Sequence, residues 1–186
     1  MINWCNFDGF FRTGIPSHII YSSLFVTTVF ICCGLFVNRI ANKTKYTLVA
    51  LLFEYSFIVV CSTIICREEQ SFDFSRLELM PFWTYKVVLS DDIPGVSIWD
   101  IILNVVLFVP LGFLVKLCWP SVTLVKMLLI ALVCSLFIET NQYVFEKGLV
   151  QFDDLMHNVI GGLVGWICAL ILLKANSFVN NIFVKC

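Results

Sequence analysis

The hydrophobic pattern of the chain consists of five long apolar runs, separated by short polar stretches and one longer connection. A helix needs about 20 consecutive apolar residues to cross the hydrocarbon core of a bilayer. Because each run has about this length, we predict an all-α integral membrane protein, a bundle of five transmembrane helices forming one domain. The predicted spans are residues 18–37, 46–66, 99–119, 124–145 and 155–174.

Composition supports this prediction, since 60% of the 186 residues are hydrophobic and only 13% are charged. A soluble domain has an apolar share of about 45–50%, so this class is excluded. The first run is not typical of a cleaved signal peptide, because its positive charges (Arg39, Lys43, Lys45) follow it. We therefore expect residues 18–37 to be a retained helix and residues 1–17 to be an interfacial segment.

The distribution of Lys and Arg predicts the orientation in the membrane, because these residues concentrate in short cytoplasmic loops. If the first connection is cytoplasmic, the opposite side carries most of the carboxylates. The N-terminus is then outside, the C-terminus is inside, and residues 175–186 form a short cytoplasmic tail. Cys5 and Cys66 would both lie outside and could form a disulfide bond. The predicted cytoplasmic cations are Arg39, Lys43, Lys45, Lys116, Lys126, Lys174 and Lys185.

The longest connection, residues 67–98, mixes aromatic and charged residues. Such sequence tends to lie at the level of the lipid headgroups. Two interpretations stay open for this external loop. It could cap the outer mouth of the bundle and contact a ligand, or it could only anchor the helices at the interface.

Polar residues recur near the predicted outer ends of the third and fourth spans. Asp100 and Asn104 are four residues apart and therefore share one helix face. Ser135, Glu139 and Gln142 form a single stripe on the fourth span. A carboxylate inside an apolar span is costly unless it has a partner or a water-filled pocket. Glu139 is therefore the strongest candidate for a functional role.

The fifth span begins with Asp153, Asp154, His157 and Asn158, of which the last three share a helix face. An Asp at this position could also be a helix cap, and an Asn could be an interhelical hydrogen-bonding residue. Because polar residues gather at a similar depth on three helices, we predict a ligand-binding pocket there. The candidate ligand-binding residues are Asp100, Asn104, Glu139, Gln142, Asp153, Asp154, His157 and Asn158.

Four residues are predicted to serve helix packing. Gly161 and Gly165 form a G-x-x-x-G pattern that allows close helix contact. Pro110 frees a backbone carbonyl, and Gly112 permits close approach. Glu54, in the second span, lies away from the outer cluster; we expect it to bond to a Ser, Thr or backbone group, with a transport role as an alternative.

The candidate site suggests three chemistries. We expect no cofactor, although a divalent metal at Asp153, Asp154 and His157 is a weaker alternative. A second histidine at helical spacing is missing, since the other one is His18. If the protein is an enzyme, Glu139, Asp154 and His157 are the catalytic candidates, as acid, base and proton carrier. The sequence contains no G-x-S-x-G motif that would supply a nucleophile.

Several ordered motifs resemble the VanZ-like family of bacterial membrane proteins. They read N-V-V-L-F-V-P-L-G-F from residue 104, S-L-F-I-E-T-N-Q from 135, F-D-D-L-M-H-N-V-I-G-G-L-V-G from 152, and upstream L-M-P-F-W-T-Y from 79. The resemblance covers about residues 40–175. The motif positions are Asn104, Phe108, Pro110, Gly112, Glu139, Gln142, Asp154, Asn158, Gly161 and Gly165. Many members have a basic residue before the Asp-Asp pair, where this chain has G-L-V-Q at residues 148–151.

The resemblance implies a multi-pass protein of the bacterial cytoplasmic membrane, linked to teicoplanin resistance and to tolerance of lipid-anchored antibiotics. The leading hypothesis is a binding protein whose partners are membrane lipids, with a lipid-linked wall precursor or a lipoglycopeptide as candidate ligand and no nucleic acid. A membrane enzyme acting on a lipid headgroup is the first alternative. A small transporter or assembly partner is the second, and the sequence does not indicate an oligomeric state.

Overall fold

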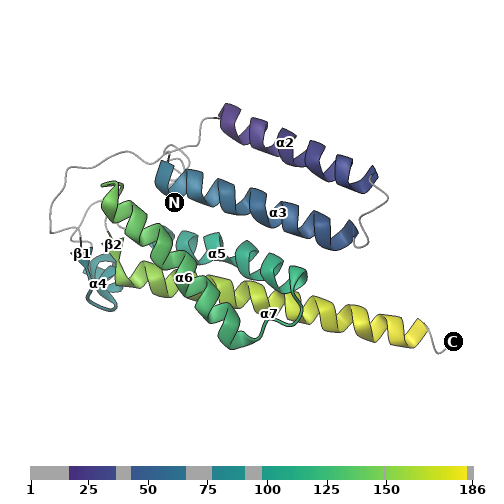
Figure 1. Cartoon of the computed structure of the whole chain (residues 1–186). Helices are drawn as coiled ribbons and strands as arrows, with labels where there is room; N and C mark the ends of the chain where they lie inside the picture. Colours follow the sequence, from purple (N-terminus) through teal and green to yellow (C-terminus); the bar gives the residue numbers. More distant parts are fainter. Residues whose placement is uncertain (1–16, 37–42, 66–76, 91–97, 149, 184–186) are drawn as a thin grey trace, which may run out of the picture.

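The computed structural model describes residues 17–36, 43–65, 77–90, 98–148 and 150–183, with side chains described for residues 23–32 of the first range and up to residue 175 of the last. These residues are almost entirely helical (Figure 1). The helices are α2 (Ser17–Phe36), α3 (Lys43–Val60) with its π-helical extension η1 (Cys61–Ile65), α4 (Trp83–Ser90), α5 (Ile98–Cys118), α6 (Leu124–Val144) and α7 (Phe152–Phe183).

Four helical segments are long and apolar enough to cross a membrane, and they correspond to the second to fifth predicted spans. They are Lys43–Ile65, Ile98–Cys118, Leu124–Val144 and Phe152–Ala175. Helix α2 occupies the position of the first predicted span, and its described apolar stretch, Ser23–Cys32, is shorter. The prediction of an all-α membrane bundle is confirmed, whereas the orientation stays a prediction.

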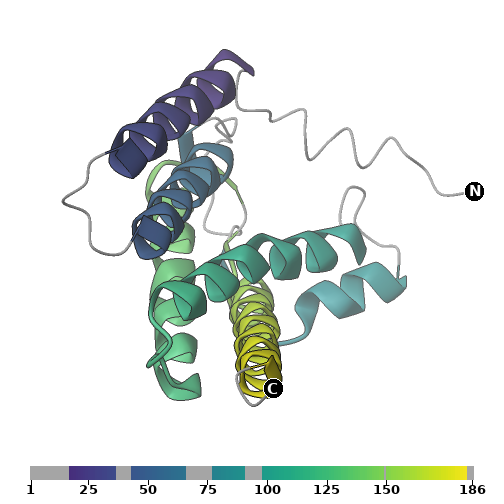
Figure 2. The same ribbon diagram turned by 90° about the vertical axis from the view of Figure 1, so that its right-hand side faces the viewer.

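Helices α5 and α7 pack backbone against backbone near the middle of the bundle, where Figure 2 shows α5 crossing α7. A Cβ atom at Gly161 would collide with the carbonyl oxygen of Val105, and one at Gly165 with that of Val109. Gly112 lies equally close to the backbone of α7. The three glycines singled out in the sequence thus lie where the two helices approach most closely.

A further glycine, Gly162, supports the contact between α7 and α6. A Cβ atom there would meet side-chain atoms of Ala131 and Met127, both fully buried on α6. Helix α7 therefore carries adjacent glycines that face two different neighbours. The sequence pattern did not single out Gly162, because it is outside the four-residue repeat.

Helix α3 is joined to α5 near Pro110, which lies inside α5. The hydroxyl of Tyr55 donates a hydrogen bond to the carbonyl oxygen of Leu107, three residues before the proline. A proline interrupts the hydrogen-bond ladder of its helix, and neighbouring helices can bond to the carbonyl groups this leaves available. Tyr55 bonds to the carbonyl next to the one that Pro110 leaves without its helical partner, that of Val106, and so joins α3 to α5 beside this interruption.

Helix α2 is held to α3 by the carboxyl group of Glu54, which is buried. Its oxygens accept hydrogen bonds from the hydroxyls of Ser23 at 2.9 Å and Thr27 at 2.6 Å. Near the other end of the pair, the Tyr46 hydroxyl donates to the carbonyl of Phe30 at 2.9 Å. Glu54 thus has the hydroxyl partners that its depth in the span made necessary.

The long connection between α3 and α5 contains regular structure that the sequence analysis did not predict. Strand β1 (Leu77–Glu78) pairs in parallel with β2 (Val150–Gln151), and α4 follows β1. Figure 1 shows these elements together at one end of the bundle, beside the start of α7. Elements this short depend on tertiary contacts more than on their own sequence pattern.

Helix α7 continues to Phe183, so most of the predicted tail at residues 175–186 is helical. Residues 1–16 of the predicted interfacial segment (1–17) lie outside the described residues, as do Cys5 and Cys66.

Candidate functional site

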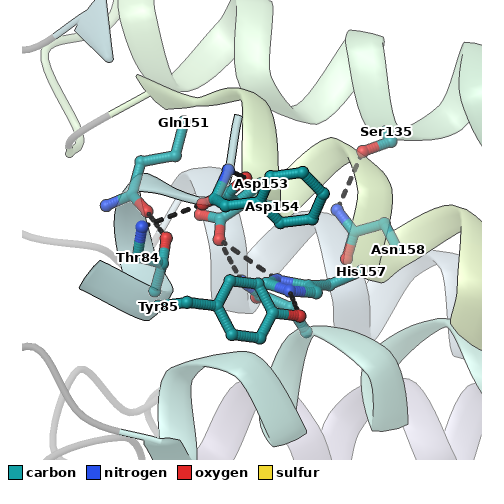
Figure 3. Close-up of polar contacts among 10 residues, drawn as sticks. Thr84, Tyr85, Ser135, Gln151, Asp153, Asp154, His157 and Asn158 are labelled. Carbon is teal, nitrogen blue, oxygen red and sulfur yellow. Dashed lines mark hydrogen bonds and ion pairs between the residues drawn. The ribbon is translucent and has the colours of Figure 1, made fainter. Parts of the chain in front are cut away.

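Four residues at the start of α7 contact three neighbouring helices, and we call them the α7 hub (Figure 3). Residues on a helix are about 100° apart around its axis, so residues within two turns can face different partners. Asp153 and His157 contact α4 or the residues just before it, Asp154 contacts α5, and Asn158 contacts α6. The α7 hub consists of Asp153, Asp154, His157 and Asn158.

Asp153 caps the N-terminus of α4. Its carboxylate accepts hydrogen bonds from the backbone N–H groups of Phe82 at 2.7 Å and Thr84 at 2.8 Å, and Asp153 is only 2% exposed. The first N–H groups of a helix have no partner within it, and negative charge is favoured at this end. The sequence allowed a cap on α7 itself, but the structure shows that Asp153 caps another helix.

Two further contacts fix α4 against the α7 hub. The hydroxyl of Thr84, which is buried, donates to the side-chain oxygen of Gln151 at 2.7 Å. Gln151 belongs to β2, whose pairing with β1 lies just before α4. Helix α4 is therefore held by its cap, by a side-chain hydrogen bond and by the strand pair.

Asp154 is the more accessible carboxylate of the pair, with its side chain 22% exposed. It accepts a hydrogen bond of 2.6 Å from the side-chain amide of Asn104 on α5. The Nδ1 atom of His157 lies 4.0 Å from the same Oδ1 atom of Asp154. On its other side, the Nε2 atom of His157 is 2.8 Å from the hydroxyl oxygen of Tyr85 on α4.

The stripe on α6 is buried and faces the rest of the bundle. Ser135 accepts a hydrogen bond of 2.8 Å from the side-chain amide of Asn158. Gln142 donates to the backbone carbonyl of Thr63 in η1 at 3.1 Å. Glu139, between them on the stripe, is 6% exposed. The side chain of Glu139 is thus buried beside residues that join α6 to α7 and to η1.

An apolar cavity of about 320 Å³ lies between α3, α5 and α6. On each of these helices, the residues that line the cavity begin about one turn from a polar residue. These polar residues lie at the end of the bundle that contains the α7 hub. Phe108 follows Asn104 by four residues, Cys134 and Ile138 precede Gln142 by eight and four, and Val59 precedes Thr63 by four. The lining residues include Tyr55, Val59, Leu107, Phe108, Cys134 and Ile138.

The structure brings most of the predicted site residues together, with one exception at the edge. Asp100 is exposed at the start of α5, one turn before Asn104. Within the described ranges, no group of three or more His, Cys, Asp or Glu residues could hold a metal ion. Both oxygens of Asp153 are already engaged by the start of α4.

Sequence reasoning missed Thr84, Tyr85 and Gln151 as parts of the site. Thr84 and Tyr85 end the L-M-P-F-W-T-Y stretch that carried part of the family resemblance. Their partners follow about 70 residues later in the chain, and no spacing rule connects them. The motif indicated that Thr84 and Tyr85 matter, but only the tertiary structure shows which residues they contact.

These features define a multi-pass membrane protein in which most of the buried polar residues among those described gather at one end of the bundle, around the α7 hub. The chain belongs to the VanZ/LLP1 family, whose family model matches residues 47–173. This match includes α5, α6, the α7 hub and almost all of α3, whereas α2 precedes it. The resemblance inferred from the motifs is thereby confirmed.

One curated relative with significant similarity is Protein VanZ of Enterococcus faecium. It is 30% identical over 66 residues, which is 36% of this chain. The matched stretch spans 41% of the length of Protein VanZ. None of the solved structures matches the chain significantly.

Proposed function

We propose that this VanZ-family protein binds an amphiphilic component of the bacterial envelope and thereby contributes to tolerance of glycopeptide or lipopeptide antibiotics. The candidate ligands are an envelope lipid, a lipid-linked wall precursor or a lipoglycopeptide. The observation that carries the proposal is the position of the apolar cavity one helical turn from polar residues on the same helices. We call Asn104, Glu139, Gln142 and Asp154 the polar layer.

The cavity has the chemistry of a site for a hydrocarbon chain. An apolar cavity of about 150 Å³ already binds benzene, and small-molecule pockets usually measure about 300–1,000 Å³. The 320 Å³ cavity is at the small end of this range, so it fits part of one chain rather than a whole amphiphile. The headgroup would then lie at the polar layer, which the predicted topology places in the outer leaflet.

The first test replaces the carboxyl groups of the polar layer by amides while keeping the shape of the side chains. We expect Glu139→Gln and Asp154→Asn each to weaken ligand binding about tenfold or more, a loss of about 1.4 kcal/mol or more. Tolerance of teicoplanin should be lost in cells that depend on this chain. The measurement is the minimal inhibitory concentration, together with the amount of protein in the membrane.

Glu146→Gln is the matched control, because it makes the same chemical change just beyond the end of α6. We expect it to leave tolerance unchanged. Full tolerance in both polar-layer variants, with normal membrane abundance, would reject the pocket.

The second test fills the cavity. Cys134→Phe introduces a ring into the lining, and we expect a loss of about tenfold or more in affinity for the acyl chain, because the ring occupies part of the volume that the chain would fill. Val125→Phe places the same ring on an exposed position of α6 and should have no such effect. Binding is measured with a phosphatidylglycerol that carries a fluorescent acyl chain, using protein in nanodiscs. Equal binding by both variants would show that the cavity is not the chain site.

A further inference from the structure

The tertiary structure supplies a nucleophile candidate that the sequence did not reveal. We propose that Tyr85, His157 and Asp154 form a catalytic relay, with the Tyr85 hydroxyl as nucleophile, acting on an acyl ester of an amphiphile at the membrane interface. The contacts run in one line from α4 to α5, since the Tyr85 hydroxyl is 2.8 Å from His157 Nε2, His157 Nδ1 is 4.0 Å from Asp154, and Asp154 is held by Asn104 (Figure 3).

The surroundings of His157 select the tautomer that such a relay needs. Nδ1 is buried, has no hydrogen-bond partner among the described residues, and faces the carboxylate of Asp154. A proton on Nδ1 is attracted by this carboxylate, whereas a lone pair there would be repelled. Nε2 is then the acceptor and the Tyr85 hydroxyl is the donor, which is the arrangement of a nucleophile and its general base. The distance of 4.0 Å between His157 Nδ1 and Asp154 Oδ1 can shorten to a hydrogen bond, since catalytic hydrogen bonds are often long before a substrate binds.

Tyr85 and His157 differ in solvent exposure, as a nucleophile and its buried general base should. Tyr85 is 39% exposed, so part of the residue lies at the surface, whereas His157 is 2% exposed and shielded from water. The ring of Tyr85 is held edge-on to that of His157, with centroids 5.6 Å apart. Tyr85 also lies on the helix that Asp153 caps, only one residue after Thr84. The backbone that carries Tyr85 is therefore held in place by contacts that do not involve its hydroxyl.

The surface around Tyr85 indicates the class of substrate. Phe82, Leu89 and Met80 are exposed apolar side chains on or beside α4. Such a surface is typical of a helix that lies at the membrane interface. A lipid presents its carboxylic esters at this level, at the boundary between headgroup and chain, so an acyl ester is the reacting group that fits this surface.

The ester is cleaved in two steps, acyl transfer to Tyr85 and hydrolysis of the acyl-tyrosine. The oxygen of Tyr85 attacks the acyl carbon while its proton passes to His157 Nε2, and Asp154 stabilises the imidazolium through Nδ1–H. The bond to the alcohol then breaks, and the alkoxide takes the proton from His157. Water, deprotonated by His157, attacks the acyl-tyrosine, releases the fatty acid and restores the Tyr85 hydroxyl. No other reactant is needed. Asp154 acts through His157 and is a positioning residue.

The relay and the proposed chain cavity are separate. The cavity lies between α3, α5 and α6, whereas Tyr85 projects from α4. Tyr85→Phe removes the hydroxyl but keeps the ring, so it should abolish acyl transfer while leaving binding of the fluorescent phosphatidylglycerol unchanged. This outcome separates failure of the relay from failure of the binding proposal.

The first experiment measures reactivity without a natural substrate. Purified full-length protein in detergent is incubated with an aryl sulfonyl fluoride, which loses fluoride when a tyrosine oxygen attacks its sulfur. We expect Tyr85 to be modified at least about tenfold faster than Tyr143, since a positioned general base contributes about 10²–10⁴-fold. His157→Gln should bring the rate at Tyr85 down to that at Tyr143. Equal rates in the wild-type protein would overturn the proposal, even if every variant failed to fold.

The second experiment measures turnover of p-nitrophenyl decanoate in detergent micelles. Wild-type protein and the control Tyr143→Phe should release nitrophenol, and Tyr85→Phe should not. Asp154→Asn should reduce the rate, and Asp154→Glu should restore part of it, which a purely structural role of Asp154 in holding Asn104 does not require. Hydrogen exchange of α4 verifies that Tyr85→Phe keeps the helix docked. Equal turnover by Tyr85→Phe and Tyr143→Phe, or none in the wild-type protein, would reject the relay.

Discussion

The substitutions Gly161→Ala and Gly165→Ala are expected to destabilise the bundle strongly, although each adds only one methyl group. The added carbon would lie within 3.0 Å of a backbone carbonyl of α5, at Val105 or Val109 respectively. A backbone carbonyl cannot turn aside as a side chain can, so α5 and α7 must move apart along their whole contact. Overpacking costs about 1–3 kcal/mol and occasionally more, and we expect about 3 kcal/mol or more here.

Gly162→Ala is the matched control for this prediction. Its methyl group would overlap much less, since it would lie 2.9 Å from the Cβ of Ala131 and 3.4 Å from the flexible end of Met127. We therefore expect a clearly smaller loss of stability. The measurement is thermal unfolding in detergent, followed by tryptophan fluorescence and by the monodispersity of the protein. If Gly162→Ala were as damaging as Gly161→Ala, helix separation would not be the cause.

The spans were predictable because each one carries its own signal. An apolar run of about 20 residues is recognisable without knowledge of its neighbours, and four of the predicted spans agree with the helices of the structure. The glycine pair was predictable for a similar reason, since G-x-x-x-G places both residues on one face. The predicted stripe on α6 is also buried, with Ser135, Glu139 and Gln142 all inside the bundle.

The partners of the polar residues were not predictable from spacing. Asp154, His157 and Asn158 share one face of α7, as expected, yet they bond to α5, α4 and α6. One face of a central helix meets several neighbours, and periodicity does not say which. The same limit applies to Asp153, whose partners are backbone groups about 70 residues earlier.

The departure from the family pattern before the Asp-Asp pair has a local role in this chain. Where the family resemblance leads us to expect a basic residue, Gln151 accepts the hydrogen bond from Thr84, and its strand β2 pairs with β1. Lys147, which lies four residues before Gln151, donates its backbone N–H to the carbonyl of Gln142 in the turn after α6. In this chain the segment before the Asp-Asp pair thus contributes to the docking of α4.

Asp153→Ala is expected to release α4 from the bundle while leaving the spans folded. The substitution removes the acceptor of the N–H groups of Phe82 and Thr84. A buried polar group without a partner costs about 1–3 kcal/mol, and the N–H of Thr84 is buried, so we expect the eight-residue α4 to leave its docked position. Hydrogen exchange of Trp83–Ser90 should therefore rise steeply, while α5, α6 and the central part of α7 stay protected.

Two comparisons make this result specific. Asp100→Ala removes an exposed carboxylate one turn before Asn104 and should leave exchange of α4 unchanged. Asp153→Asn keeps one carbonyl oxygen and should give an intermediate effect, because an amide oxygen can accept from only part of the pair. Since release of α4 also separates Tyr85 from His157, the selective reactivity of Tyr85 should disappear in Asp153→Ala. If α4 stayed protected in Asp153→Ala, Gln151 and the β1–β2 pair would hold the helix without the cap. Asp153 would then not be needed for docking, and the earlier prediction that it contacts a ligand would stand.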